Sequence, residues 1–106
     1  MSVVNVISEL KAGAPLITLM KMVKGIFDDR SSAEELYIDL IPVLQDLLQQ
    51  GRGFNDPSVQ HIVHILSELP PEGARRRNFA HKYLQDEYTL RKLPSNPRDI
   101  PYGYWH

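Results

Sequence analysis

The sequence predicts an all-α fold, a compact bundle of four or five helices with an extended Pro- and aromatic-rich C-terminal arm. Apolar residues recur at helical spacing in almost every periodic stretch, and no stretch alternates with the period of two that is typical of a strand. Glycines and prolines separate these stretches. Because the connections between them are short, neighbouring helices are expected to be antiparallel.

The first two helices are expected over residues 3–10 and 15–27, separated by the AGAP stretch. In the first, Val3, Val6, Ile7 and Leu10 share one face. The second begins at Pro15, because proline is accepted at the first helical position. Its apolar face covers an arc of about 160° and consists of Leu16, Leu19, Met20, Val23, Ile26 and Phe27.

The third helix is expected within residues 28–51. An S-x-x-E capping box beginning at Ser31 or Ser32 starts it, and Gly51 ends it. Pro42 falls on the polar side, so a bend is expected there rather than a break. The predicted buried stripe is Leu36, Leu40, Val43, Leu44 and Leu47.

Two further helices complete the predicted bundle. Asp56 caps the fourth, Pro57 occupies its first turn, and its apolar residues are Val59, Ile62, Val63 and Leu66. The last is expected to run from Glu72 or Ala74 to about Leu93. Its two apolar lines are Phe79, Tyr83 and Leu90, expected in the core, and Ala80, Leu84 and Tyr88, either covered by the tail or binding a partner.

Length and composition fit one helical domain over residues 1–93 followed by an arm over residues 94–106. With 42% apolar and 24% charged residues, the chain resembles ordinary globular proteins. The chain has no cysteine, which excludes disulfides and thiolate chemistry. We expect a cytoplasmic protein without membrane insertion, because there is no signal-peptide pattern and no apolar run of about 20 residues.

Charge is distributed unevenly along the chain. Residues 1–70 carry five Lys/Arg and nine Asp/Glu, a net charge of −4, whereas residues 71–106 carry seven and four, a net charge of +3. Arg75, Arg76 and Arg77 lie near a predicted helix N-terminus, where positive charge opposes the helix dipole. Either the acidic part of the chain or an acidic partner is expected to offset this cost.

The C-terminal arm, LPSNPRDIPYGYWH, combines three prolines with two tyrosines and the only tryptophan. Prolines lower the entropy lost on docking, Gly103 allows a turn, and Tyr and Trp are enriched at interface hot spots. We therefore predict a small non-enzymatic protein–protein interaction module: an adaptor, assembly subunit or inhibitor. Its partner is a protein with an acidic or groove-like surface, or a second copy of the chain. The predicted contact residues are Arg75, Arg76, Arg77, Tyr88, Tyr102, Tyr104 and Trp105.

Two alternative functions follow from other residues. The basic C-terminal third is a candidate nucleic-acid-binding surface, although its arginines point in separate directions around the helix. His61, His64 and Glu68 share one helix face and are a weaker candidate for a metal-dependent activity, because that face is expected to be solvated. No cofactor motif or catalytic motif accompanies them, so no cofactor is expected.

Overall fold

The computed structural model describes residues 3–26 and 29–105. Over these residues the chain forms six α-helices, one 3₁₀-helix and no strand, which confirms the all-α prediction. The elements are α1 (Val3–Lys11), α2 (Leu16–Val23), α3 (Arg30–Gln49), α4 (Pro57–Glu68), α5 (Gly73–Tyr83), α6 (Glu87–Leu90) and the 3₁₀-helix η1 (Pro97–Asp99). None of the helices in the described part of the chain has the length and apolar character that a bilayer crossing requires.

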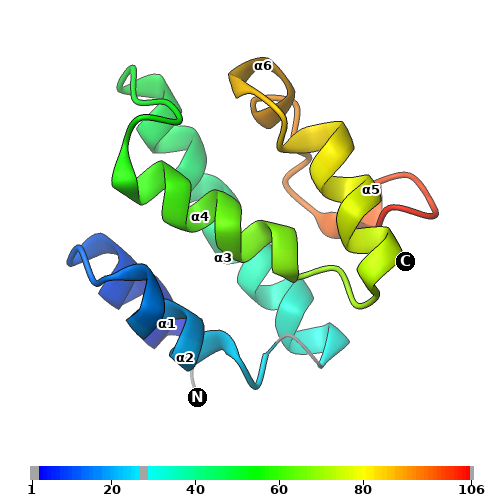
Figure 1. Ribbon diagram of the computed structural model, residues 1–106, viewed down its shortest axis with the longest axis horizontal. Helices are drawn as coiled ribbons and strands as arrows, with labels where there is room; N and C mark the ends of the chain where they lie inside the picture. The colour runs from blue at the N-terminus through cyan, green and yellow to red at the C-terminus, as the bar shows by residue number, and fades with distance from the viewer. Residues whose placement is uncertain (1–2, 27–28, 106) are drawn as a thin grey trace.

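The helices α3 and α4 form the centre of the bundle (Figure 1). The α1–α2 hairpin packs on one side, with α1 in contact with both central helices. On the other side α5 packs against α4, and α6 packs against α5. The chain then returns through η1, which contacts α3. Residues 97–99 thereby close the bundle beside a helix that ended almost fifty positions earlier in the sequence.

The hairpin between α1 and α2 depends on Gly13. This residue has a φ of 84°, and the amide of Ala14 donates to Glu9 O over 3.0 Å, the bonding pattern of a Schellman helix end. Pro15 is the N-cap of α2 rather than its first helical residue. The expected helix to residue 27 is too long, since α2 ends at Val23; Phe27 and the Val3 side chain lie outside the described part of the structure.

The long helix α3 begins one residue before the predicted capping box. Asp29 is its N-cap and accepts from the amide of Ser31 at 3.3 Å, so neither serine box is the cap. An aspartate is as effective an acceptor there as a serine, and it lies earlier in the chain. The helix continues unbroken through the exposed Pro42. It ends at a Schellman motif in which Gly51 has a φ of 84°.

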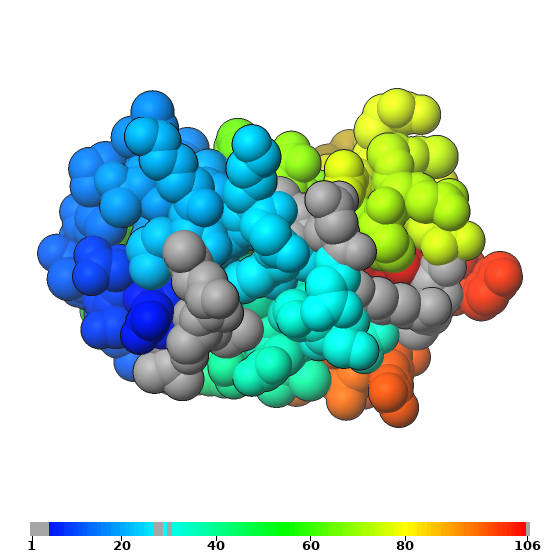
Figure 2. Space-filling model, turned by 90° about the horizontal axis from the view of Figure 1, so that it is seen from below, coloured from blue at the N-terminus to red at the C-terminus, as the bar shows by residue number. Residues whose placement is uncertain are grey.

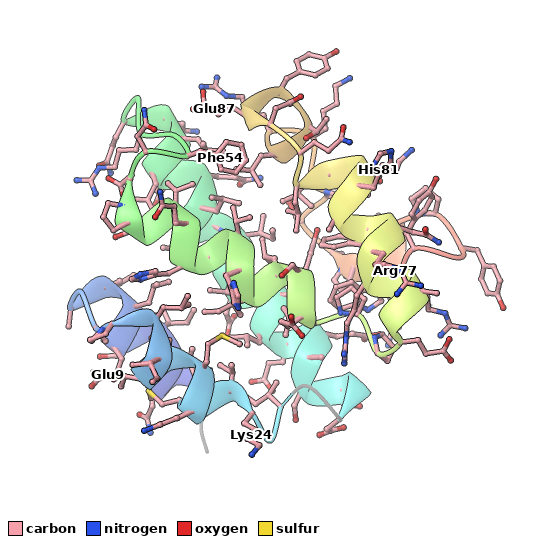
Figure 3. The ribbon with its side chains drawn as sticks, viewed as in Figure 1. Glu9, Lys24, Phe54, Arg77, His81 and Glu87 are labelled. Atoms are coloured by element: carbon pink, nitrogen blue, oxygen red, sulfur yellow. The ribbon has the colours of Figure 1, made fainter. Side chains whose placement is uncertain are left out.

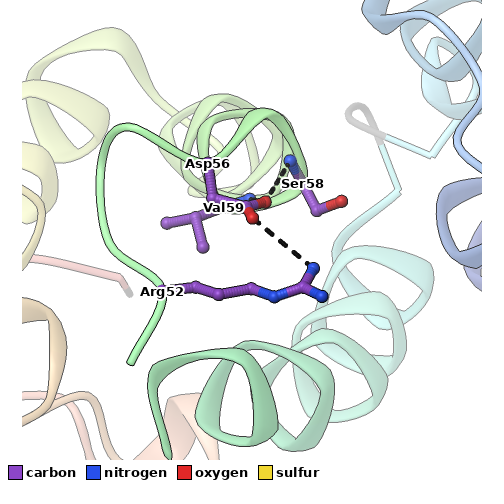
Figure 4. Close-up of polar contacts among 4 residues, drawn as sticks. All are labelled: Arg52, Asp56, Ser58 and Val59. Carbon is purple, nitrogen blue, oxygen red and sulfur yellow. Dashed lines mark hydrogen bonds and ion pairs between the residues drawn. The ribbon is translucent and has the colours of Figure 1, made fainter. Parts of the chain in front are cut away.

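The start of α4 matches the prediction. Asp56 accepts from the amides of Ser58 at 2.8 Å and Val59 at 3.4 Å, and its second oxygen lies 3.4 Å from a guanidinium nitrogen of Arg52 (Figure 4). One carboxylate thus satisfies two of the unpaired N–H groups of the first turn and joins the helix to the loop before it.

The single long helix predicted over residues 72–93 is wrong. The chain leaves the helix after Tyr83 and re-enters one at Glu87. Asp86 caps α6 by accepting from the amide of Thr89 at 2.8 Å, while the Thr89 hydroxyl accepts from the amide of Asp86 at 3.3 Å. This local capping box competes with continuation of α5, and residues 80, 84 and 88 therefore do not form one helical face.

The core is continuous from α1 to the C-terminal segment. On the predicted stripes, Leu36, Leu40, Leu44, Val59, Ile62 and Leu66 are buried, and Val43, Leu47 and Val63 are partly buried. Phe79, Tyr83 and Leu90 are also buried, as predicted for the first apolar line of the last helix. The described chain beyond residue 93 contributes Pro97, Ile100 and Trp105.

Candidate interaction surface

The C-terminal segment completes the core instead of extending from it. Ile100 and Trp105 are almost fully buried, and the hydroxyl of Tyr37 donates to the carbonyl oxygen of Pro94 over 2.7 Å. Burial, followed by the nearby Tyr83 and Asp99, raises the pKa of Tyr37 far above its ordinary value. Tyr37 therefore acts as a neutral hydrogen-bond donor that holds the start of this segment against α3.

Trp105 is the anchor at the far end of the segment. Its ring lies 5.1 Å from that of Tyr37 and 5.6 Å from that of Phe79, both in edge-to-face geometry. Its exposed fraction is 0%, and its Nε1 atom has no hydrogen-bond partner among the described residues. The prediction that Trp105 contacts a partner is therefore wrong, because an aromatic ring that can reach an apolar core in its own chain is more stable there than in water.

A tight turn before Trp105 brings a different aromatic residue to the surface. The amide of Tyr104 donates to Pro101 O over 3.2 Å, and Gly103 has a φ of 99°, as the third position of a type II turn requires. Tyr102, at the second position, is 86% exposed. In Figure 2 the end of the chain, coloured red, projects from the side of the molecule beside the start of α5.

The turn and α5 enclose an open groove of about 480 Å³. Its α5 wall consists of Asn78, His81 and Lys82, and its other wall consists of Tyr102, Gly103 and Tyr104. We call this the α5–turn groove. The structure thus brings Tyr102 and Tyr104, two of the predicted contact residues, together with three α5 side chains that were not predicted as contact residues.

Lys82 is held at the edge of the groove by aromatic rings. Its ammonium nitrogen lies 5.2 Å from the ring centroid of Tyr104 and 5.7 Å from that of Tyr83. A cation over an aromatic face is stabilised by about 0.5–1 kcal/mol at exposed sites. Burial, together with the nearby Tyr104, raises the pKa of Tyr83. Tyr83 therefore stays neutral at physiological pH, and its ring and that of Tyr104 provide aromatic faces beside the positive charge of Lys82.

The three consecutive arginines of α5 have different environments. Arg75 lies 3.7 Å from a carboxylate oxygen of Glu72, and Arg76 donates through Nε to Pro70 O over 2.5 Å, next to the end of α4. Internal contacts thus offset part of the expected helix-dipole cost. Arg77 is exposed and lines a second hollow that Glu68 also borders. Figure 3 shows Arg77 and His81 on the side of the molecule where the C-terminal segment lies.

Tyr88 is exposed but lies apart from the groove. It belongs to α6, where the ammonium of Lys92 lies 4.1 Å from its ring centroid, and it is not among the residues that line the α5–turn groove. Leu84 is buried and Ala80 is partly buried, so the second apolar line does not form a helical binding face. A role for Tyr88 in partner binding stays a prediction, separate from the groove.

The proposed histidine ligand set does not form. Among the described residues there is no group of three or more His, Cys, Asp or Glu side chains that could hold a metal ion. His61, His64 and Glu68 all belong to the described α4, where His61 and Glu68 are partly buried and His64 is exposed. Their positions on the helix surface do not bring the three donor groups to one point.

The sequence contained a signal for the missed groove residues. Asn78, His81 and Lys82 are related by steps of three and four, which places them on one face of a helix. The pattern could not identify this face as a wall of a groove, because the opposite wall is a turn whose position depends on Trp105.

We compared the chain with protein-family models, with curated proteins and with solved structures, and no match was found in any of the three.

Proposed function

We propose that this chain is a small non-enzymatic protein–protein interaction module, an adaptor, assembly subunit or inhibitor, that binds its partner at the α5–turn groove. The observation that supports this proposal most directly is that Tyr102 is 86% exposed, whereas Tyr104 is partly buried and Trp105 is fully buried. The backbone on both sides of Tyr102 is anchored, so the residue is presented at a fixed point of the surface.

Preorganisation is what makes such a residue suitable for binding. A tyrosine has only two side-chain torsions to immobilise, and its backbone here is already restrained by a hydrogen-bonded turn and by Trp105. Aromatic residues contribute a large share of the free energy at interface hot spots. Two other predicted contact residues lie on this side of the molecule: Tyr104 lines the groove, and the exposed Arg77 directly precedes the groove residue Asn78 on α5 (Figure 3).

Site-specific photo-crosslinking tests this function. The photoreactive residue p-benzoylphenylalanine replaces Tyr102 in one version of the full chain and Ile17 in the other. Ile17, on α2, is a matched control because it is an apolar residue that is 67% exposed. Both proteins are irradiated in lysate from the source organism and the adducts are identified by mass spectrometry.

The proposal predicts a discrete protein adduct from position 102 that is absent from position 17. An adduct with a second copy of the chain identifies self-association as the function of the surface. Equal labelling at both positions, or no protein adduct at position 102, contradicts the proposal.

A further inference from the structure

The lining of the α5–turn groove indicates the chemistry of its occupant. This inference rests on the proposed function, because it concerns the same site. Among the six lining residues there is no carboxylate, whereas an amide, an imidazole, an ammonium group and two phenols provide hydrogen-bond donors. A surface with a positive charge and several donors is complementary to a ligand that carries negative charge and accepts hydrogen bonds.

Two contacts fix the donors on α5. Lys82 is positioned by the rings of Tyr83 and Tyr104, as described above. The side-chain nitrogen of Gln85 lies 3.0 Å from Nδ1 of His81. Because an amide nitrogen only donates, Nδ1 accepts this bond and the proton of the neutral ring is carried by Nε2. His81 therefore keeps its one N–H donor, at Nε2, which Gln85 does not use.

The groove has room for a short segment of polypeptide. Its volume of about 480 Å³ is within the roughly 300–1,000 Å³ range of small-molecule sites, so it can hold a short segment and not a folded domain. The groove is open to solvent, so a chain can enter and leave it. The aromatic wall formed by Tyr102 and Tyr104 gives apolar contact area to the stem of a bound side chain or to the peptide backbone.

Charge also distinguishes a short acidic segment from a nucleic acid. A nucleic acid is bound through many phosphate contacts. The six lining residues include no arginine. The exposed Arg77 lines the other hollow, which Glu68 borders, and Arg98 lies 3.7 Å from a carboxylate oxygen of Glu34. The one Lys or Arg among the lining residues is Lys82, which matches one carboxylate rather than a continuous phosphate backbone. We propose that the α5–turn groove binds a short extended acidic peptide segment of a partner protein, with a carboxylate paired to Lys82 and with Tyr102 packed over the segment.

Peptide selection followed by affinity measurement tests this inference. A phage-displayed library of random dodecapeptides is selected against the full chain, and peptides that also bind the Tyr102→Ala variant are removed. We expect the enriched sequences to be rich in Asp and Glu. Enrichment of neutral or basic sequences, or no enrichment, overturns the inference.

Variants then locate the charge that is recognised. Binding of the most enriched peptide is measured by fluorescence anisotropy with wild type, Lys82→Glu and Lys24→Glu. Lys24 is a matched control because it is an exposed lysine that follows α2, on the opposite side of the bundle (Figure 3). Reversing an exposed charge is expected to weaken binding roughly five-fold or more at Lys82, and less than about two-fold at Lys24. Equal effects of the two substitutions contradict a carboxylate contact at Lys82.

A labelled oligothymidylate gives the competing outcome. If it binds more tightly than the peptide, with an affinity that falls steeply with salt, the ligand is a nucleic acid and the inference fails. The two proposals fail separately. A crosslinked partner at position 102 combined with non-acidic enriched peptides keeps the interaction function and removes the acidic ligand. Acidic peptides that bind at Lys82 without a crosslinked protein keep the ligand chemistry and remove the proposed protein partner.

Discussion

Replacement of Trp105 by alanine is expected to destabilise the whole fold, although the residue is next to the end of the chain. The side chain is fully buried and contacts the rings of Tyr37 and Phe79. Replacing a buried Trp or Phe by Ala costs about 3–5 kcal/mol of unfolding free energy. The substitution also removes the indole N–H, a buried donor without a partner among the described residues, whose desolvation costs about 1–3 kcal/mol.

These two contributions have opposite signs, so we expect a net loss of about 2–4 kcal/mol for Trp105→Ala. Trp105→Phe separates them. It keeps an aromatic ring against Tyr37 and Phe79 while it removes the N–H group, and we expect its stability to lie within about 1 kcal/mol of wild type. The difference between the two variants therefore measures the ring packing and not the loss of the indole donor.

Urea unfolding followed by circular dichroism at 222 nm measures both variants. For a domain of this size the slope is about 1–3 kcal/mol/M, so the midpoint for Trp105→Ala falls by about 1–2 M. Tyr102→Ala is the control, since a substitution at an exposed site changes stability by less than about 0.5 kcal/mol. A loss below about 1 kcal/mol for Trp105→Ala would show that the tryptophan does not pack in its own core.

Three further substitutions test other contacts. Tyr37→Phe removes the hydrogen bond to Pro94 and is expected to cost about 0.5–1.5 kcal/mol at neutral pH in urea unfolding. Because the pKa of Tyr37 is raised on folding, wild-type stability is expected to fall as pH rises above the ordinary tyrosine value of about 10, and the variant should fall less steeply. Gly53→Ala places a methyl group where the Glu87 carboxylate lies, so the Glu87 side chain moves away and loses its hydrogen bond from the amide of Phe54. The unfolding free energy is expected to fall by about 0.5–1 kcal/mol, and not to fall in a Glu87→Ala background. Asp56→Ala removes the N-cap of α4 and is expected to cost about 1 kcal/mol, whereas Asp56→Asn, measured in the same way, should retain most of that free energy.

The parts of the fold that were predictable depend on neighbouring residues in the sequence. The stop at Gly51, the cap and first turn of α4 at Asp56 and Pro57, and the buried faces of α3 and α4 follow from local spacing. Each of these features forms its main contacts within one or two helical turns. Local chemistry is therefore sufficient to specify them, and tertiary packing agrees with it.

The break between α5 and α6 shows where the periodic pattern was insufficient. The spacing of apolar residues across 79–90 is compatible with one helix, and both apolar lines were therefore predicted to lie on a single helix. The alternative is encoded in Asp86 and Thr89, which together form a capping box that can be read from the sequence. An N-cap stabilises the start of a new helix by a few tenths to about 2 kcal/mol. The spacing of apolar residues alone therefore does not decide between one continuous helix and two helices.

The cis docking of the C-terminal segment was not predictable, because it depends on a pocket assembled from distant residues. Tyr37 and Phe79 are separated by more than forty positions, and only the packed bundle brings their rings into contact with each other and with Trp105. The sequence shows that a Pro-spaced aromatic segment is suited to lie against an apolar surface. It does not show whether that surface belongs to the same chain.

Burial of Trp105 and exposure of Tyr102 are consequences of one turn. Once the tryptophan is fixed in the core, the chain must reverse direction within the few residues that follow Ile100, and the positive φ of Gly103 permits this reversal. A type II turn directs the side chain at its second position outward, so the same geometry that completes the core also presents Tyr102 beside Lys82. Substitution of Trp105 is therefore expected to lower stability, because this residue maintains the position of the turn. Substitution of Tyr102 is expected to weaken binding, because this residue uses that position to contact a partner.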